Sequence, residues 1–377
     1  MSRTPGRRPR VRKARGASAV GRRFEAEVGP VAHGGHFVVR LPEEDGNRVV
    51  FVRHALPGER VVLEITDGTD GDKFWRGDAV EVLSASPDRV PAPCPYAGPG
   101  LCGGCDLQHV DLGAQRRLKA DVVREQLRRV AKIDVDVEVE AVPGDQDGLR
   151  WRTRQRYVGL PDGRRGMRKH RSHEVVPVEE CLLEAPTGPS YDVDGRAFEV
   201  ADGGFWQVHP GAPSTLVDAV LGALRPQPGE SALDLYAGVG LFSRFLLEAV
   251  GPTGRVAAIE GDGAASALSE SNCPGITAHA GDVGEVLAGG LPPGWDRAHL
   301  VVLDPPRVGA RRPVVEEIVR RAPRAVAYVA CDPAALARDV AIFAEHGYRL
   351  ASLRAFDLFP MTHHVECVAL LEPVTSA

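Results

Sequence analysis

Two patterns of hydrophobic and polar positions divide the chain. Between Phe24 and about Leu83, short runs of alternating apolar and polar residues are separated by Gly-rich turns. Five such runs in about 60 residues are typical of a small β-barrel of the OB (oligonucleotide-binding) type. From Ser231 onward, apolar runs of strand length alternate with segments of helical periodicity, which is the pattern of a doubly wound α/β sheet. The sequence therefore predicts an N-terminal barrel and a C-terminal Rossmann-like domain.

The second pattern is regular enough to assign residue ranges. Its predicted strands are 231–237, 255–261, 276–282, 299–304, 324–331, 348–357 and 364–371. The predicted helices are 212–224, which precedes the sheet, and 241–250, 263–271, 312–322 and 333–346. In a sheet of this kind, ligands bind at the carboxyl ends of the strands.

Prolines at positions 91 and 93 mark the end of the barrel. Residues 1–18 are poor in apolar side chains and are expected to form a disordered basic tail. The predicted organisation therefore has four parts, which are the tail (1–18), the barrel (19–87), a central α+β domain (88–204) and the C-terminal domain (205–377).

Charge is distributed unevenly along the 377 residues. Residues 1–23 hold nine of the 46 Lys and Arg residues and no acid. A basic tail on an acidic body favours a polyanionic partner, with a merely solubilising tail as the alternative. No apolar stretch approaches the roughly 18 residues of a membrane span, and the basic N-terminus lacks the apolar centre of a signal peptide. We therefore expect a cytoplasmic monomer with no membrane partner.

A strand, a Gly-rich turn and a helix are predicted over Ser231–Ser243, which reads S-A-L-D-L-Y-A-G-V-G-L-F-S. This arrangement places backbone N–H groups and a helix N-terminus beside a bound ligand. Gly238 and Gly240 form a G-x-G, but Ser243 occupies the place of the third glycine of the dinucleotide fingerprint. Asp234 suits a ligand with a cationic end better than a pyrophosphate. We therefore expect S-adenosylmethionine (SAM), with a nucleotide or a purely structural turn as the alternatives.

Acidic residues follow at the ends of the next predicted strands. Glu260 is placed to bind both ribose hydroxyls of a nucleoside. Asp282 can accept from an adenine amine, and a helix-capping role is an almost equal alternative. Asp304 begins D-P-P-R, whose two prolines stiffen the loop and leave carbonyls free to face a base. Arg307 stands where amino-methylating enzymes usually carry an aromatic residue, which argues against methylation of an exocyclic amine.

Two residues carry groups for nucleophilic and base catalysis. Cys331 ends a predicted strand just before a helix, where the pKa of a thiol is lowered and its thiolate becomes nucleophilic. A buried structural cysteine is the alternative. Glu366 is an acid in an otherwise apolar final strand, so burial should raise its pKa into the range of a general base. Cys273 and Cys367 lie in no comparable context and are expected to be structural.

Four further cysteines have the spacing of a metal site. Cys102 and Cys105 are separated by two glycines, a turn that aims two thiolates at one metal. Cys94 and Cys181 can supply the third and fourth ligands. Four thiolates fit either an iron–sulfur cluster or zinc, and unliganded cysteines remain an alternative. The spacing C-x7-C-x2-C differs from the C-x3-C-x2-C of radical-SAM enzymes and argues against that chemistry.

An arginine-rich segment lies between these cysteines. R-W-R-T-R-Q-R-Y (150–157) alternates strictly, and as a strand it would place four arginines on one face: Arg150, Arg152, Arg154 and Arg156. Five more basic residues follow between positions 163 and 171. Such a surface would bind RNA phosphates, with a solvated face as the alternative.

Together these segments resemble the RNA (uracil-5-)-methyltransferase family. The resemblance begins near residue 17 and includes a TRAM-type barrel, C-G-G-C-x-x-Q-H, G-M-R-K-H-R-S-H-E-V-V-P-V-E-E-C, F-W-Q, D-L-Y-A-G-V-G, D-P-P-R-V-G, C-D-P and H-H-V-E. It implies a [4Fe-4S] cluster at the four cysteines, Cys331 as nucleophile and Glu366 as base. It also implies SAM contacts at Gln207, Tyr236, Glu260, Asp282 and Asp304.

The resemblance implies methylation of uridine C5 in ribosomal or transfer RNA. Attack of the Cys331 thiolate on C6 would make C5 nucleophilic, C5 would take the methyl group from SAM, and Glu366 would remove the C5 proton before Cys331 leaves. The target base must leave its stack, so a loop or locally opened RNA is expected. The alternatives are a non-catalytic RNA-binding protein that keeps the fold and a SAM enzyme that methylates an exocyclic amine. Neither explains both Cys331 and Glu366.

Overall fold

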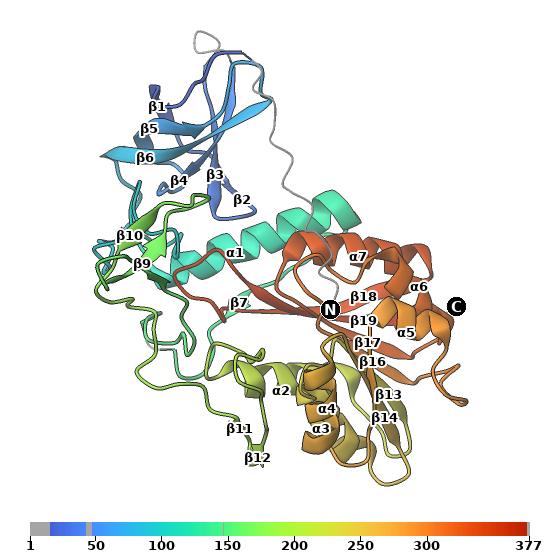
Figure 1. The fold of residues 1–377 in the computed structure, drawn as a ribbon. Helices are drawn as coiled ribbons and strands as arrows, with labels where there is room; N and C mark the ends of the chain where they lie inside the picture. Colours follow the sequence, from blue (N-terminus) through green and yellow to red (C-terminus); the bar gives the residue numbers. More distant parts are fainter. Residues whose placement is uncertain (1–15, 43–46, 146, 375–377) are drawn as a thin grey trace. The chain divides into compact units, whose positions relative to one another are not determined.

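The computed structural model describes residues 16–42, 47–145 and 147–374 (Figure 1). The chain forms two compact units, one of residues up to 91 together with 98–100, and one of residues 92–97 and 101 onward. Most of the basic tail expected at 1–18 lies outside the described residues. Within the described ranges, no helix is long and apolar enough to cross a membrane.

The first unit is a six-stranded sheet in the order β1-β5-β6-β4-β3-β2. Neighbouring strands are antiparallel except β4 and β6, which are parallel. Alternation along the strands buries one side of each, as in β5, where Val61, Leu63 and Ile65 are inaccessible to solvent. This confirms the small β-barrel expected from the sequence. The strands are β1 (Arg23–Glu27), β2 (Val31–Ala32), β3 (His36–Arg40), β4 (Val49–Arg53), β5 (Arg60–Asp67) and β6 (Phe74–Ser84).

The second unit is built on an eight-stranded sheet in the order β15-β14-β13-β16-β17-β19-β18-β7. The first five strands in this order are parallel, β19 is antiparallel to both β17 and β18, and β7 is parallel to β18. Every strand predicted from residue 231 onward is present. The strands are β13 (Ser231–Leu235), β14 (Arg255–Glu260), β15 (Thr277–Ala280), β16 (Leu300–Leu303), β17 (Ala325–Ala330), β18 (Tyr348–Phe356), β19 (Glu366–Pro373) and β7 (Val139–Glu140).

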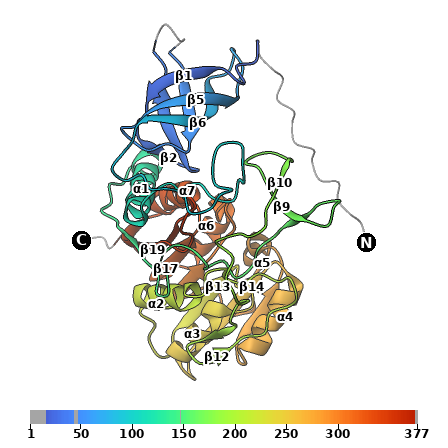
Figure 2. The same cartoon turned by 90° about the vertical axis from the view of Figure 1, so that its left-hand side faces the viewer.

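Helices cover both faces of this sheet (Figures 1 and 2). On one face, α1, α5, α6 and α7 pack over a core that includes Leu233 and Leu235. On the other face, α2, α3 and α4 pack over a core that includes Ala232. Successive residues of β13 thus enter opposite cores, which explains why the strand reads as an uninterrupted apolar run around Asp234. The doubly wound α/β prediction is confirmed.

Helices α2, α3, α4, α6 and α7 lie within a few residues of their predicted ranges, whereas α1, η2 and α5 were not predicted. The helices are α1 (Leu112–Gln126), its π-helical continuation η2 (Leu127–Ala131), α2 (Ala212–Leu224), α3 (Leu241–Val250), α4 (Gly263–Asn272), α5 (Val283–Gly289), α6 (Arg311–Arg320) and α7 (Pro333–Glu345).

Both α1 and β7 come from the segment expected as a separate central domain, but they pack against the C-terminal sheet and belong to the same compact unit. Small ladders complete that segment: β8 (Val158–Gly159), β9 (Arg165–Arg168) and β10 (Val175–Pro177), and β11 (Asp192–Val193) with β12 (Arg196–Ala197).

Candidate active site

A cleft of about 1140 Å³ lies at the carboxyl ends of the parallel strands. It gathers eight of the ten residues predicted for cofactor binding and catalysis: Gln207, Tyr236, Gly238, Glu260, Asp282, Asp304, Cys331 and Glu366. The other two, Asp234 and Gly240, do not line it. Residues that the sequence argument did not assign also form its wall, including Asp106, Phe205, Phe359 and His363.

The turn after β13 forms one end of the cleft. Tyr236, Gly238 and Gly240 all have positive φ, at 61°, 55° and 92°. A Cβ at Gly240 would lie 2.9 Å from the Cys273 sulfur, whereas a Cβ at Gly238 would meet nothing within 4 Å. Gly240 is therefore required for packing and backbone conformation, while Gly238 leaves open space where the cleft begins.

Two predicted acids lie beside this turn. The carboxylate of Glu260, at the end of β14, accepts from the backbone N–H of Gly238 at 2.8 Å and of Asp262 at 2.7 Å. Asp282 is the N-cap of α5 and accepts from the N–H of Glu285 at 3.1 Å. The capping alternative for Asp282 is therefore correct, and the same residue also lines the cleft.

Asp234 is buried beneath the turn, with 1% of its surface exposed. The Ser243 hydroxyl donates to Oδ2 at 2.6 Å, and Oδ1 has no hydrogen-bond partner among the described residues. Burial raises the pKa of Asp234 to about 7, although the bonds from Ser243 act in the opposite direction. A buried carboxyl with an unused oxygen is a costly feature for a purely structural turn.

The opposite end of the cleft is assembled by strand pairing. β17 and β19 are antiparallel, with Ala330 opposite Cys367. The strand end that leads to Cys331 therefore lies beside the strand start at Glu366, although the two residues are far apart in sequence. Asp304 follows β16, which is the parallel neighbour of β17. Pairing thus brings a thiol and two carboxyls to one edge of the sheet.

These two carboxyls are buried and influence each other. Burial raises the pKa of Asp304 to about 7, and the charge of Asp234 adds to the effect. Burial also raises the pKa of Glu366 well above its usual value, with a further increase from Asp304 and an opposing effect from Arg307. The direction predicted for Glu366 is confirmed. Its Oε1 has no hydrogen-bond partner among the described residues.

The prediction of a lowered pKa for Cys331 is wrong for the ligand-free protein. Burial raises the pKa of this thiol to about 12, and the charges of Glu366 and Asp304 raise it further. The helix-terminus effect does not outweigh this burial, and Asp332, the N-cap of α7 that accepts from the N–H of Ala335 at 2.8 Å, adds a further increase. Forming the thiolate therefore requires transfer of its proton to a neighbouring base.

The D-P-P-R-V-G loop is fastened to α7 by a residue that the sequence argument missed. Asp339 is fully buried, and its Oδ2 accepts from the N–H of Ala310 at 2.8 Å and from the Tyr328 hydroxyl at 2.7 Å. A Cβ at Gly309 would lie 2.5 Å from the same oxygen. The loop that carries Asp304 and the helix that follows Cys331 are thus held together.

His364 contacts the same loop. The Arg307 guanidinium donates to Nε2 of His364 at 3.1 Å. Burial lowers the pKa of His364 to about 3, and neighbouring His363 and Arg307 lower it further. The imidazole of His364 is therefore neutral at physiological pH and accepts from Arg307.

All four cysteines predicted as ligands line a second, smaller pocket: Cys94, Cys102, Cys105 and Cys181. Three of the sulfurs accept hydrogen bonds, from Gly104 N–H to Cys102, from Gln108 to Cys105 and from Gln155 to Cys181, at 3.2–3.4 Å. Across the described chain, no three or more His, Cys, Asp or Glu side chains are grouped to hold a single metal ion. The four cysteines thus share one pocket.

The predicted arginine strand over 150–157 is wrong. Most of this segment is irregular, Arg150 has a φ of 57°, and Arg152 forms only an isolated bridge with Glu184. Trp151 is buried and packs against Phe359, whereas Tyr157 is only half-buried with Arg165 over its ring, so the alternation does not mark one buried strand face. The arginines separate accordingly. Arg150 pairs with Glu180, Arg154 donates to the Gly204 carbonyl, Arg156 is exposed, and Arg152 lines both the cleft and the cysteine pocket.

The fold and the position of the cleft define the class of the second unit, which is that of the SAM-dependent methyltransferases. The solved structure of Pyrococcus abyssi tRNA (uracil-54, C5)-methyltransferase in complex with S-adenosyl-L-homocysteine has a similar fold, with a TM-score of 0.66 at 20% sequence identity. The match covers 92% of this chain and 100% of that one.

Sequence comparison then identifies the family. The profile of tRNA (Uracil-5-)-methyltransferase matches residues 296–374, and that of the TRAM domain matches residues 17–80. An uncharacterized RNA methyltransferase of Streptomyces avermitilis is 43% identical over 94% of this chain and 99% of its own length. The 23S rRNA (uracil(1939)-C(5))-methyltransferase RlmD of Methylococcus capsulatus is 30% identical over 92% of this chain and 96% of its own length. The chain belongs to the RNA (uracil-5-)-methyltransferase family.

Proposed function

We propose that this enzyme transfers a methyl group from SAM to C5 of a uridine in RNA, through a covalent bond between Cys331 and C6. The observation that carries the proposal is that Cys331, Glu366 and Asp304 all line one end of the cleft, while the Gly-rich turn forms the other end. A thiol with two buried carboxyls is the set of groups that nucleophilic activation of a pyrimidine requires. An exocyclic amine would need no thiol.

The turn end of the cleft fits SAM. Glu260 lies at the end of β14, where an acid binds ribose hydroxyls, and the open space at Gly238 admits a ligand close to the backbone. Asp282 and Gln207 offer further polar groups along the same wall. Asp234 lies beneath the turn, where the cationic end of bound SAM would favour its ionised form. Bound SAM supplies the methyl group.

At the catalytic end, the reaction proceeds by addition of the thiolate, methyl transfer and elimination. A neighbouring carboxylate takes the thiol proton, and the Cys331 sulfur bonds to C6, which moves an electron pair onto C5 and O4 of the ring. C5 then accepts the methyl group. Glu366 removes the C5 proton, and the electron pair of that C–H bond restores the C5–C6 double bond as the sulfur leaves. Because burial raises the pKa of Glu366, its carboxylate is a strong base whenever it is ionised. The positive charge of Arg307 favours that ionised form.

The cysteine pocket fits a [4Fe-4S] cluster held by Cys94, Cys102, Cys105 and Cys181. Four thiols that line one pocket match the all-thiolate ligand set of such a cluster, and a zinc ion held by the same four cysteines is the alternative. Such a cluster would cross-link the ligand segments and have a structural role. Metal and sulfide analysis after anaerobic purification tests this. Zinc, or no metal, would contradict the cluster.

The RNA would be held in part by Arg152, which lines the cleft. Among the four arginines predicted for RNA binding, Arg150 is paired with Glu180 and is a natural control. Arg152→Ala should reduce the slope of log affinity against log salt by about one, and Arg150→Ala should change it less. Equal effects of the two variants would contradict a specific role for Arg152.

The 23S rRNA specificity of the Methylococcus relative makes large-subunit ribosomal RNA the first substrate to test, with transfer RNA beside it. Incubation with RNA containing 5-fluorouracil and SAM should trap a covalent complex, because fluorine at C5 cannot leave as a proton does. A non-catalytic RNA-binding protein and an amine methyltransferase would both give no adduct. Mass-spectrometric mapping of 5-methyluridine in RNA from cells without the protein then identifies the nucleotide.

A further inference from the structure

Residues 357–365 form the loop that joins β18 to β19, and Glu366 is the first residue of β19. Four side chains of this loop line the cleft: Phe359, Thr362, His363 and His364. Because β19 starts directly after the loop, the path of the loop backbone sets where the Glu366 carboxyl lies. The contacts that hold the loop come from α1 and its preceding segment.

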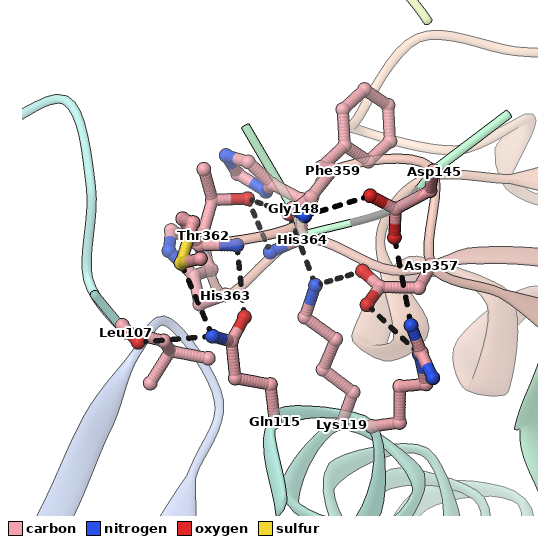
Figure 3. A network of polar contacts seen from close by, with 12 residues as sticks. Leu107, Gln115, Lys119, Asp145, Gly148, Asp357, Phe359, Thr362, His363 and His364 are labelled. Atoms are coloured by element: carbon pink, nitrogen blue, oxygen red, sulfur yellow. Dashed lines mark hydrogen bonds and ion pairs between the residues drawn. The ribbon is translucent and has the colours of Figure 1, made fainter. Parts of the chain in front are cut away.

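A buried lysine on α1 holds the start of the loop (Figure 3). Lys119 is 2% exposed, and its ammonium donates to the Asp357 carboxylate and, at 3.0 Å, to the Phe359 carbonyl. Arg116 and Asp145 complete the charge balance, with Arg116 lying 3.5 Å from both Asp145 and Asp357. Lys119 does not line the cleft, so it cannot act on substrate directly.

A buried glutamine holds the middle of the loop. Oε1 of Gln115 accepts from the Met361 N–H at 2.8 Å, and its Nε2 donates to the carbonyls of Leu107 and Val110 at 3.1 and 2.9 Å. Met361 has a φ of 64°, a conformation that is unfavourable for a residue with a Cβ. Such a backbone persists only where its surroundings fix it, and Gln115 supplies part of that constraint.

The segment after Cys105 holds the other side of Met361. The Met361 carbonyl accepts from the N–H groups of both Asp106 and Leu107 at 3.0 Å. The Asp106 carboxylate accepts from the His363 backbone N–H at 3.2 Å and contacts the His363 ring nitrogen Nδ1 at 2.6 Å. The loop is thus fixed between α1 and the cysteine segment.

We propose that Gln115 and Lys119 are positioning residues, which fix residues 357–364 so that Glu366 is in place to remove the C5 proton after methyl transfer. The inference rests on the proposed function, in which Glu366 is the base. It predicts a specific defect, because a displaced base leaves Cys331 attack and methyl transfer intact while the last step slows. The covalent, methylated protein–RNA species should then accumulate.

The experiment uses Gln115→Met, which keeps the volume of the side chain and removes its four hydrogen bonds, which are the three above and one from Nε2 to the Met361 sulfur at 3.3 Å. Gln126→Met is the matched control, since Gln126 is also buried on α1 but its side chain bonds, within the described part of the chain, to Glu125 and Arg129 of the same helical segment. Purified variants are incubated with RNA and methyl-labelled SAM and separated on a denaturing gel, with Glu366→Gln as the reference. We expect kcat to fall about 10- to 100-fold for Gln115→Met with little change in KM, and labelled protein–RNA to accumulate. Gln126→Met should do neither.

A second variant keeps the test decisive if Gln115→Met folds poorly. Lys119→Met alone would leave the buried Asp357 charge without its closest partner, so Lys119→Met is combined with Asp357→Asn. Label accumulation in either soluble variant supports the inference. Loss of turnover without labelled species in both, while Glu366→Gln does trap label, overturns the positioning role alone. If Glu366→Gln also traps nothing, the base assignment itself falls.

Discussion

The two ends of the cleft are built in different ways. The turn end comes mainly from one continuous stretch, in which β13, the Gly-rich turn and α3 follow each other and Glu260 of the adjacent strand accepts from the Gly238 backbone. The catalytic end joins Asp304, Cys331 and Glu366 from three strands and is held by contacts from α1 and α7. We expect the turn end, which is organised by local backbone conformation, to bind SAM independently of the catalytic end, so that SAM binding and methyl transfer separate on mutation.

Cys331→Ala should give the largest effect and separate the two ends most cleanly. Without a nucleophile for C6, methyl transfer should fall by about 10⁴-fold or more. SAM affinity, measured by calorimetry, should stay within about twofold, because the turn end does not depend on the thiol. A large loss of SAM affinity would show that the two ends are not independent.

Glu260→Ala tests the opposite end. It removes the carboxylate that accepts from Gly238 and Asp262, so we expect SAM affinity to fall by about 10- to 100-fold. At saturating SAM the rate of methyl transfer should recover to near the wild-type value. A kcat defect that SAM cannot overcome would contradict the separation.

Asp234→Asn should show that the buried Asp234 carboxyl lowers the stability of the folded protein. The folded protein keeps the Asp234 proton up to about pH 7, whereas the unfolded chain releases it near pH 4, so this group lowers stability as pH rises through that window. The variant should therefore be more stable than wild type by about 1–2 kcal/mol at pH 8 and show a smaller gain at pH 5. Its SAM affinity should fall. Thermal unfolding at the two pH values checks the sign, and a gain larger at pH 5 would contradict it.

A pair of glycine variants tests the backbone of the turn and should affect the chemical step least. Gly240→Ala places a Cβ 2.9 Å from the Cys273 sulfur and should cost about 1–3 kcal/mol of stability. Gly238→Ala meets nothing within 4 Å, so only its positive φ opposes it, at about 1 kcal/mol. Chemical denaturation measures the loss of stability in each variant. For the same loss of stability, SAM affinity should fall more in Gly238→Ala than in Gly240→Ala.

The same contrast explains what the sequence could predict. The turn end follows from local patterns, and every strand from residue 231 onward lies near its predicted range. The meeting of Cys331 and Glu366 was inferred by resemblance, since the antiparallel pairing of β17 with β19 is not readable from periodicity. The wrong direction for the Cys331 pKa arose because burial of the thiol, and the charges of Glu366 and Asp304 beside it, depend on tertiary packing that the local sequence does not show.

The support of the catalytic end was missed because its residues look ordinary in sequence. Gln115 and Lys119 lie in a helix that does carry signals, with Asp111 at the N-cap and apolar residues at helical spacing, so α1 itself was predictable. Their buried contacts with 357–361 were not, because they join segments about 240 positions apart. The arginine alternation misled for a related reason, because Trp151 packs against Phe359, a contact distant in sequence that the alternation does not reveal.

The most direct test of the account is the fate of the methyl group in Glu366→Gln. This variant retains Cys331 and the cofactor end but lacks the base, so methyl transfer should occur and C5 deprotonation should stall. With methyl-labelled SAM, label should comigrate with a protein–RNA species on a denaturing gel for Glu366→Gln and not for Cys331→Ala. Turnover of Glu366→Gln near the wild-type rate, with no labelled complex, would contradict the account.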